Sequence, residues 1–307
     1  MDTKMSRSWL AGIGGLVATL MIIGGPTVGA EPASQPQPQL LWPKGPPDNN
    51  GLHGPEVVRG CIGNISIPTI TLFRAPKDKA TGAAVVVMLG GGYSVVCVAT
   101  EGLPIARKLN ELGITAVVLN YRLPNHHDVI PAEDARRAIR TTRYMAAQWG
   151  IDPHRVGVWG FSAGGHLAST VTTAYDAGNP NSADPVERMS SRPDFSLLFY
   201  PVISMQDDIA HKGSRHNLMG DEDLKQRYSS ELHVTADTPP CLLLACSDDR
   251  VVRVENTVRF YQALVAHKVP ATCLIFEQGG HGPNAFLKNP SWEGAFHEWL
   301  KKRGCLK

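Results

Sequence analysis

Ser162, Asp249 and His281 are of the three residue types that nucleophilic catalysis requires, and each lies just beyond an apolar run. Ser162 is the centre of a Gly-x-Ser-x-Gly motif at residues 160–164, between a run that ends at Trp159 and a stretch with helical spacing. A strand-to-helix turn of this kind exposes a serine hydroxyl above a sheet. Near pH 7 that hydroxyl needs an imidazole to take its proton and a carboxylate to orient the imidazole. The sequence therefore predicts a catalytic triad of Ser162, Asp249 and His281.

Two alternatives to these assignments concern the acid and the base. Asp248 is the nearest rival of Asp249, which we favour because it lies closest to the turn into the next helical segment. Among the other histidines, His166 lies just inside the helix after Ser162, where a packing role is expected. The chain order of serine, acid and histidine is that of the α/β-hydrolases and differs from the orders of chymotrypsin and subtilisin.

Three consecutive glycines, residues 90–92, end an earlier apolar run. Glycines allow backbone N–H groups to turn toward one point, as an oxyanion hole requires. A phosphate-binding loop is not indicated, because the Lys-Ser/Thr pair and the Gly-x-Gly-x-x-Gly spacing are missing. We expect the oxyanion donors to be the N–H groups of Gly91 or Gly92 and of Ala163.

The elements that must position these residues alternate regularly between strand and helix. Strands are predicted at 65–73, 83–89, 115–120, 155–159, 195–200, 241–246 and 271–276, and helices at 103–112, 132–149, 163–175, 222–232, 254–267 and 292–302. This alternation predicts an α/β fold with a mostly parallel sheet covered by helices on both faces. Ligands of such sheets lie beyond the carboxyl ends of the strands, where all three motifs fall. Two insertions, 175–192 and 205–240, are expected to edge the site without forming a large lid domain.

Several motifs together carry a family resemblance. They are AVVVMLGGGY at 84–93, EG at 101–102, NYRL at 120–123, Asp134 with AIR at 138–140, GFSAGGHLA at 160–168, DRVV at 249–252 and GHG at 280–282. From about residue 57 to the end, the chain resembles the acetylesterase branch of the α/β-hydrolases, which includes bacterial acetyl xylan esterases. The resemblance implies the same triad and the same oxyanion glycines. Relatives often carry His or Pro before the glycines, where this chain has Leu89, so a contact that fixes the loop is expected to be lost.

The first fifty residues differ from the rest. Lys4 and Arg7 precede an uncharged stretch, residues 8–30, with an apolar centre and a Val-Gly-Ala ending, which predicts a signal peptide cleaved after about Ala30. An uncleaved membrane anchor is the less favoured alternative, because the stretch has five glycines from Gly12 to Gly25 and ends in small residues. Residues 31–50 contain six prolines and predict a linker or a surface arm. The catalytic domain is then 51–307, in a secreted or periplasmic protein.

Other residues that could take part in chemistry are expected to have structural roles. Asp134 is expected to pair with Arg122 rather than to bind substrate, and Glu101 either touches substrate or caps the following helix. His126 and His127 do not form a metal site, because no third ligand stands at a standard spacing. A disulfide between Cys241 and the cysteine at 273 is left open.

The sequence thus predicts a secreted serine esterase that hydrolyses short-chain, chiefly acetyl, esters of small molecules, oligosaccharides or polysaccharides without a metal or organic cofactor. A net charge of +2 argues against nucleic acid as a partner, and no stable membrane insertion is expected after signal cleavage. The alternatives are a general carboxylesterase for other short-acyl or aryl esters and a catalytically silent binding protein. Acyl chain length, alcohol specificity and oligomeric state are left open.

Overall fold

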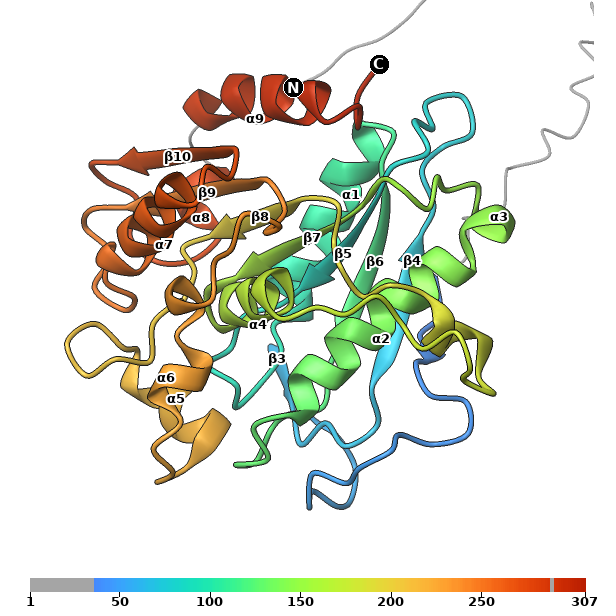
Figure 1. Ribbon diagram of the computed structural model, residues 1–307, viewed down its shortest axis with the longest axis horizontal. Helices are drawn as coiled ribbons and strands as arrows, with labels where there is room; N and C mark the ends of the chain where they lie inside the picture. The colour runs from blue at the N-terminus through green and yellow to red at the C-terminus, as the bar shows by residue number, and fades with distance from the viewer. Residues whose placement is uncertain (1–35, 288–289) are drawn as a thin grey trace, which may run out of the picture. The chain divides into compact units, whose positions relative to one another are not determined.

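A central β-sheet organises residues 36–287 and 290–307, the part of the chain that the computed structural model describes (Figure 1). The predicted signal peptide, residues 1–30, and residues 31–35 lie outside it. The strands follow the order β1 (Gln39–Leu40), β4 (Thr69–Phe73), β6 (Thr115–Asn120), β5 (Ala84–Met88), β7 (Val156–Phe161), β8 (Ser196–Phe199), β9 (Cys241–Cys246) and β10 (Ala271–Phe276). β4 is antiparallel to β1 and β6, and the strands from β6 to β10 pair in parallel.

The strand sequences explain why the sheet is buried on both faces. β5 reads AVVVM and β9 reads CLLLAC, and every residue of both strands is buried. Such unbroken apolar runs are typical of parallel strands that helices cover on both sides. The predicted α/β fold is confirmed, and the seven predicted strands lie within a few residues of β4 to β10.

Helices cover both faces of the sheet. α2 (Ile130–Tyr144) and α4 (Ser162–Thr173) pack together in front of the sheet in Figure 1, with α7 (Glu255–Ala266) beside β9 and β10. α1 (Leu103–Glu111) and α9 (Glu293–Lys302) are joined to each other by an ion pair between Lys108 and Glu293, 2.6 Å apart. Short elements complete this part of the chain: a hairpin of β2 (Val57–Arg59) and β3 (Cys61–Gly63), α3 (Ala146–Trp149) and α8 (Asn284–Leu287).

The prediction of one helix over 222–232 was wrong. The structure has α5 (Lys212–Met219), then α6 (Lys225–Tyr228) and a 3-10 turn, Ser230–Leu232. α5 begins where His211 accepts a hydrogen bond from the Ser214 N–H. The later helix is interrupted because the Ser229 hydroxyl donates to the Lys225 carbonyl and accepts from the Met205 N–H, so it ties this turn to another segment.

Residues 36–50 of the predicted linker pack on the domain and belong to the same compact unit, Pro36–Lys307. β1 pairs with β4, and Leu41 is buried. The Trp42 indole N–H donates to Asp134, and Arg122 donates both to Asp134 and to the Asp48 carbonyl. The expected pairing of Arg122 with Asp134 is thus present and fully buried. Of the two predicted alternatives, a linker or a surface arm, the packing of residues 36–50 agrees with the arm.

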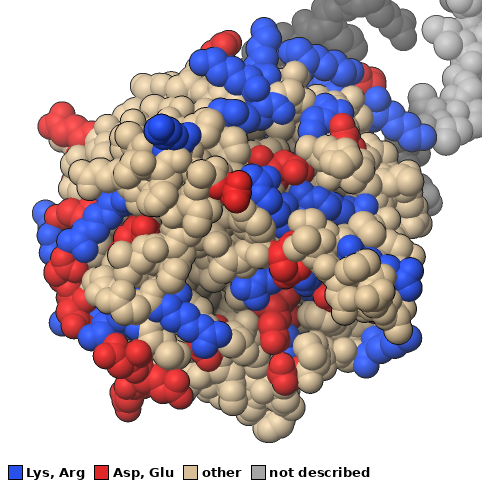
Figure 2. Space-filling view, viewed as in Figure 1, with Lys and Arg blue, Asp and Glu red and all other residues tan. Residues whose placement is uncertain are grey.

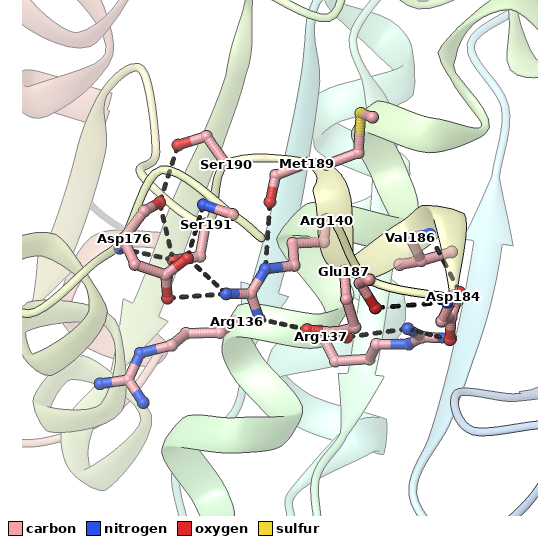
Figure 3. A network of polar contacts seen from close by, with 12 residues as sticks. Arg136, Arg137, Arg140, Asp176, Asp184, Val186, Glu187, Met189, Ser190 and Ser191 are labelled. Carbon is pink, nitrogen blue, oxygen red and sulfur yellow. Dashed lines mark hydrogen bonds and ion pairs between the residues drawn. The ribbon is translucent and has the colours of Figure 1, made fainter. Parts of the chain in front are cut away.

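The first insertion, residues 175–192, lies along α2 and not at the carboxyl edge of the parallel strands. α4 runs roughly 18 Å away from that edge before the insertion begins. Figure 3 shows how α2 holds it: Arg140 is ion-paired with Asp176 and Glu187, and Arg137 with Glu187. The expectation that this insertion edges the site was therefore wrong, whereas residues 205–240 follow the carboxyl end of β8.

Basic and acidic side chains are interspersed over the face drawn in Figure 2, in keeping with the nearly balanced charge of the sequence. A surface of mixed sign gives little attraction for a polyanion. Within residues 36–287 and 290–307, none of the helices combines the length and the apolar character needed to span a bilayer.

Candidate active site

Ser162 stands at the sharp turn between β7 and α4. Its φ of 53° lies in the left-handed region, which a non-glycine residue seldom adopts outside strained or functional positions. The glycines on either side permit the turn. A Cβ on Gly160 would lie 2.3 Å from the Gly164 carbonyl oxygen, and one on Gly164 would lie 2.2 Å from the Met88 carbonyl oxygen. The motif therefore lets α4 begin directly against β5 and β7, with Ser162 at the carboxyl edge of the sheet.

The structure brings the three predicted triad residues together. His281 Nε2 lies 2.9 Å from Ser162 Oγ, and His281 Nδ1 lies 2.7 Å from Asp249 Oδ2. Because an ionised carboxylate only accepts hydrogen bonds, Nδ1 carries the ring proton and Nε2 is free to accept the serine proton. This arrangement can generate a serine nucleophile.

Geometry distinguishes Asp249 from its neighbour. The side chain of Asp249 is 1% exposed, and its second oxygen, Oδ1, accepts from the N–H groups of Val251 and Val252 at 2.8 and 2.9 Å. The Asp248 carboxylate is exposed and instead accepts from the Gly280 N–H at 2.7 Å, which lowers its pKa. Asp249 therefore orients the imidazole, while Asp248 fixes the loop that carries it.

The glycine run lies beside the nucleophile. Gly91 and Gly92 have φ of 128° and 63°, and a Cβ on Gly91 would lie 2.2 Å from the Val95 carbonyl oxygen. The N–H groups of Gly91 and Gly92 donate to no acceptor within the described residues. Ala163 is in the first turn of α4, where N–H groups have no helical partner. These three donors are available to a negatively charged oxygen, which the N-terminal end of α4 also favours.

Glu101 holds the glycine run in place. It is 5% exposed, and its carboxylate accepts from the Gly90 N–H at 2.5 Å and from the Tyr200 hydroxyl at 3.0 Å. Burial, the largest effect, raises the pKa of Glu101, while these two hydrogen bonds and the nearby His281 oppose the rise. The Tyr200 ring meets the His281 ring edge to face, with centroids 5.0 Å apart. The helix-cap alternative for Glu101 is not what the structure shows.

The backbone of Leu89 also fixes the loop. Its carbonyl accepts from the Tyr121 hydroxyl at 2.9 Å. A disulfide between Cys61 and Cys97 then ties the far end of the loop to β3. Cys241 and Cys273 are free thiols, because β9 and β10 pair Cys241 with Ala271 and place the two cysteines out of register.

Two more histidines lie near the site. His166 is buried as predicted: its Nε2–H donates to the Tyr228 carbonyl, its Nδ1 accepts from the Tyr93 hydroxyl, and burial lowers its pKa to about 4. His211, which the sequence did not single out, is close enough to His281 for the two to interact electrostatically, and burial is the main reason that its pKa is lowered. Tyr200 and His211 carried no motif by which the sequence could identify them.

No group of three His, Cys, Asp or Glu side chains is arranged to hold a metal ion within the described residues. The His126 ring instead packs on the ring of His216 and bonds its carbonyl. The donors around Ser162 are backbone N–H groups and not metal ligands, so acyl transfer through a serine fits them without a bound cofactor.

Comparison with known proteins shows which family the chain belongs to. The BD-FAE family model matches residues 70–264, more than half of the chain, and this range includes Ser162 and Asp249. The chain belongs to the BD-FAE family. His281 follows the matched range, so its place in this BD-FAE site rests on the geometry given above.

Three similar proteins are informative about this BD-FAE chain. It is 38% identical to an acetylxylan esterase of Xylanibacter ruminicola over 212 residues, 67% of this chain and 42% of the relative. It is 36% identical to endo-1,4-beta-xylanase B of Butyrivibrio fibrisolvens over 219 residues, 67% of this chain and 33% of the relative. An acetyl ester-xyloside bifunctional hydrolase from Caldicellulosiruptor lactoaceticus matches with a TM-score of 0.78 and 37% identity, covering 89% of this chain and 98% of that one.

The chain spans less than half the length of the two curated relatives. Their similarity agrees with the predicted resemblance to acetyl xylan esterases and with the predicted class, a carboxylic ester hydrolase.

Proposed function

We propose that the protein is a serine esterase that removes short acyl groups, chiefly acetyl, from carbohydrates through Ser162, His281 and Asp249. The observation that carries this proposal is the unbroken chain of contacts from Ser162 Oγ through His281 to Asp249, beside N–H donors that have no partner in the described structure. The similarity to an acetylxylan esterase and to an acetyl ester-xyloside hydrolase supports the choice of a carbohydrate ester.

The reaction begins at Ser162. His281 Nε2 takes the hydroxyl proton as Oγ attacks the ester carbonyl, and the oxygen of the tetrahedral intermediate becomes negatively charged. Asp249 stabilises the imidazolium that forms, and His281 then donates its proton to the leaving alcohol. Water repeats these steps on the acyl-enzyme, which releases acetate and restores the serine.

The negative oxygen is stabilised by N–H groups of Gly91 or Gly92 and of Ala163. Their directions are fixed before the reaction, because Glu101 holds Gly90 and because Ala163 belongs to the first turn of α4. Donors that need no reorganisation contribute most to the rate, and the loss of one typically costs about a hundredfold to a thousandfold in kcat.

Export to an oxidising compartment is also part of the proposal. It rests on the predicted signal peptide at residues 1–30 and is supported by the disulfide between Cys61 and Cys97, a bond that is rare in the cytosol. N-terminal sequencing of the protein recovered from its native host is expected to begin near Glu31, and an N-terminus at Met1 would refute cleavage.

Acetate release from acetylated xylan, measured beside the hydrolysis of nitrophenyl esters of two to eight acyl carbons, tests the substrate class. We expect acetate from the polysaccharide and a preference for the shortest esters. Strong preference for long acyl chains with no acetate released would favour a general carboxylesterase. No hydrolysis of any ester would favour a silent binding protein.

A further inference from the structure

A small cavity lies next to the glycine loop, residues 90–92. Its volume is about 220 Å³, below the roughly 300–1,000 Å³ of sites for drug-sized ligands. Tyr93 and Ser94, which directly follow the oxyanion glycines, form one wall, and Asn217 of α5 forms another. The Asn217 side chain donates to the Gly92 carbonyl at 2.8 Å, so the cavity adjoins the loop that faces Ser162.

The hydrogen bonds around the cavity leave several amide oxygens of its lining residues without a donor. Asn64 donates both amide hydrogens, to the carbonyls of residues 53 and 55, at 2.8 and 2.9 Å. Asn125 donates to the carbonyl of residue 50 at 2.9 Å, and Asn217 donates to that of residue 92. Because a carbonyl can only accept, each amide nitrogen is assigned, and each Oδ1 remains without a donor among the described residues.

The ring nitrogens of His126 can be assigned in the same way, from the carbonyl that one of them contacts. Its Nδ1 lies 3.0 Å from the His216 carbonyl oxygen, so Nδ1 carries the proton and Nε2 of the neutral ring is an acceptor. Of the residues that line the cavity, none is Asp, Glu, Lys or Arg, while Leu52 and Leu123 add apolar surface. An uncharged ligand with some apolar surface and with hydroxyl groups, which can both donate and accept, suits this lining.

Backbone strain is concentrated at the same place. Four of the seven non-glycine residues with positive φ in the described part of the chain line this cavity, and two more, Ser162 and Tyr200, lie in the candidate active site. The four are Asn64 at 56°, Tyr93 at 61°, Asn125 at 46° and His126 at 68°. Strained backbone persists where the surrounding structure fixes it, most often at binding and catalytic sites.

We propose that this cavity binds one neutral sugar unit of the ester substrate and so selects carbohydrate esters over simple ones. The inference rests on the proposed esterase function and adds a subsite to it. Sugar hydroxyls donate to the four acceptors, and the C–H face of the ring packs on the leucines. The cavity adjoins the oxyanion loop, so a sugar held there carries its acyl group toward Ser162.

The test uses two variants that tolerate the left-handed backbone. Asn125→Gly removes the Oδ1 acceptor, and His126→Asn, whose shorter amide can still donate to the His216 carbonyl, withdraws the acceptor at the Nε2 position. For each protein, kcat/KM is measured with acetylated methyl xyloside and with 4-nitrophenyl acetate, and the ratio of the two is compared. Each variant is expected to lower this ratio about three- to tenfold, the usual effect of one lost hydrogen bond. His127→Asn is the matched control, because His127 is the exposed neighbour outside the cavity lining, and its ratio should match the wild type.

A ratio unchanged in both cavity variants, or equal losses on both esters, would overturn the subsite. Saturation-transfer NMR with unesterified methyl xyloside checks binding independently of activity, and variants are first compared by circular dichroism to establish folding. Binding that is weakened by His126→Asn supports the subsite, and absent or unaltered binding refutes it. A wild type that cleaves neither ester but binds the xyloside through His126 would refute the esterase function alone.

Discussion

Two substitutions of Glu101 distinguish the effect of its charge from its support of the glycine loop. In the wild type its buried carboxylate accepts from the Gly90 N–H and the Tyr200 hydroxyl. Glu101→Gln can keep both contacts, because the amide oxygen accepts from Gly90 and the amide nitrogen donates to the rotatable tyrosine hydroxyl. Glu101→Ala keeps neither. The two variants therefore remove first the charge alone and then the support of the glycine loop.

The structure sets the size of the effects. Glu101→Ala leaves two buried groups without partners, which costs about 2–6 kcal/mol of stability at about 1–3 kcal/mol each. It also frees the peptide that orients Gly91 and Gly92. Losing one oxyanion donor costs about a hundredfold to a thousandfold, so a loosened loop should lower kcat about a hundredfold. For Glu101→Gln, which keeps both contacts, we expect kcat and KM to stay within about threefold of the wild type.

The stability of Glu101→Gln has a pH dependence of known sign. Burial raises the pKa of Glu101 above its ordinary 4.5, so the unfolded chain ionises first. The group's contribution to stability is therefore fully present below pH 4.5 and is lost as pH rises through the folded pKa. Glutamine does not ionise. The free energy of unfolding of Glu101→Gln should thus increase relative to that of the wild type between pH 4 and pH 7.

Steady-state kinetics with 4-nitrophenyl acetate and urea denaturation at pH 4 and pH 7 measure these effects, with Glu111→Gln on the exposed end of α1 as the control. A Glu101→Ala enzyme with unchanged kcat, or one whose loss is entirely in KM, would refute the positioning role. A relative stability that falls with rising pH would refute the assigned pKa direction.

Three further predictions follow from the same contacts. Asp249→Asn should lower kcat about ten-thousandfold, whereas Asp248→Asn should change it only a few-fold, and equal losses in steady-state assays would contradict the assignment of the acid. Replacing Cys61 and Cys97 together by Ser should lower the free energy of unfolding by about 4 kcal/mol, because the disulfide closes a loop of 36 residues and so reduces the entropy of the unfolded chain. Urea titrations measure this loss, and full stability of the variant would show that the bond is not formed. Because the pKa of His166 is lowered from 6.5 to about 4, the unfolded chain protonates first, and about 3 kcal/mol of stability should be lost between pH 7 and pH 4. His166→Gln should lack that part of the loss in urea titrations over the same range, and an unchanged pH slope would contradict it.

The parts of the site that local sequence determines were predictable. The glycines around Ser162 are needed because α4 and the neighbouring strands lie so close together that a Cβ on Gly160 or Gly164 would collide with the backbone. The five-residue motif at 160–164 meets this requirement. The order of the apolar runs likewise predicted the parallel sheet. Asp249 could be chosen over Asp248 only from its place in a turn, and the structure adds the reason, two backbone N–H donors on the oxygen away from the imidazole.

Long-range contacts were not predictable from one sequence. The partners Glu101 and Tyr200 are 99 positions apart, and no sequence pattern indicated that they would meet. The cysteine that pairs with Cys97 lies in a hairpin too short to be expected. α5 escaped prediction because its sequence, KGSRHNLM, has a glycine in its first turn and little apolar periodicity.

Labelling with a fluorophosphonate probe, followed by peptide mapping, tests the central claim most directly. The account predicts one adduct per chain, on the peptide that contains Ser162, with esterase activity lost in proportion to labelling. His281→Ala should label far more slowly, because the serine then lacks its base. An adduct on another serine, or activity that survives complete labelling of Ser162, would contradict the account.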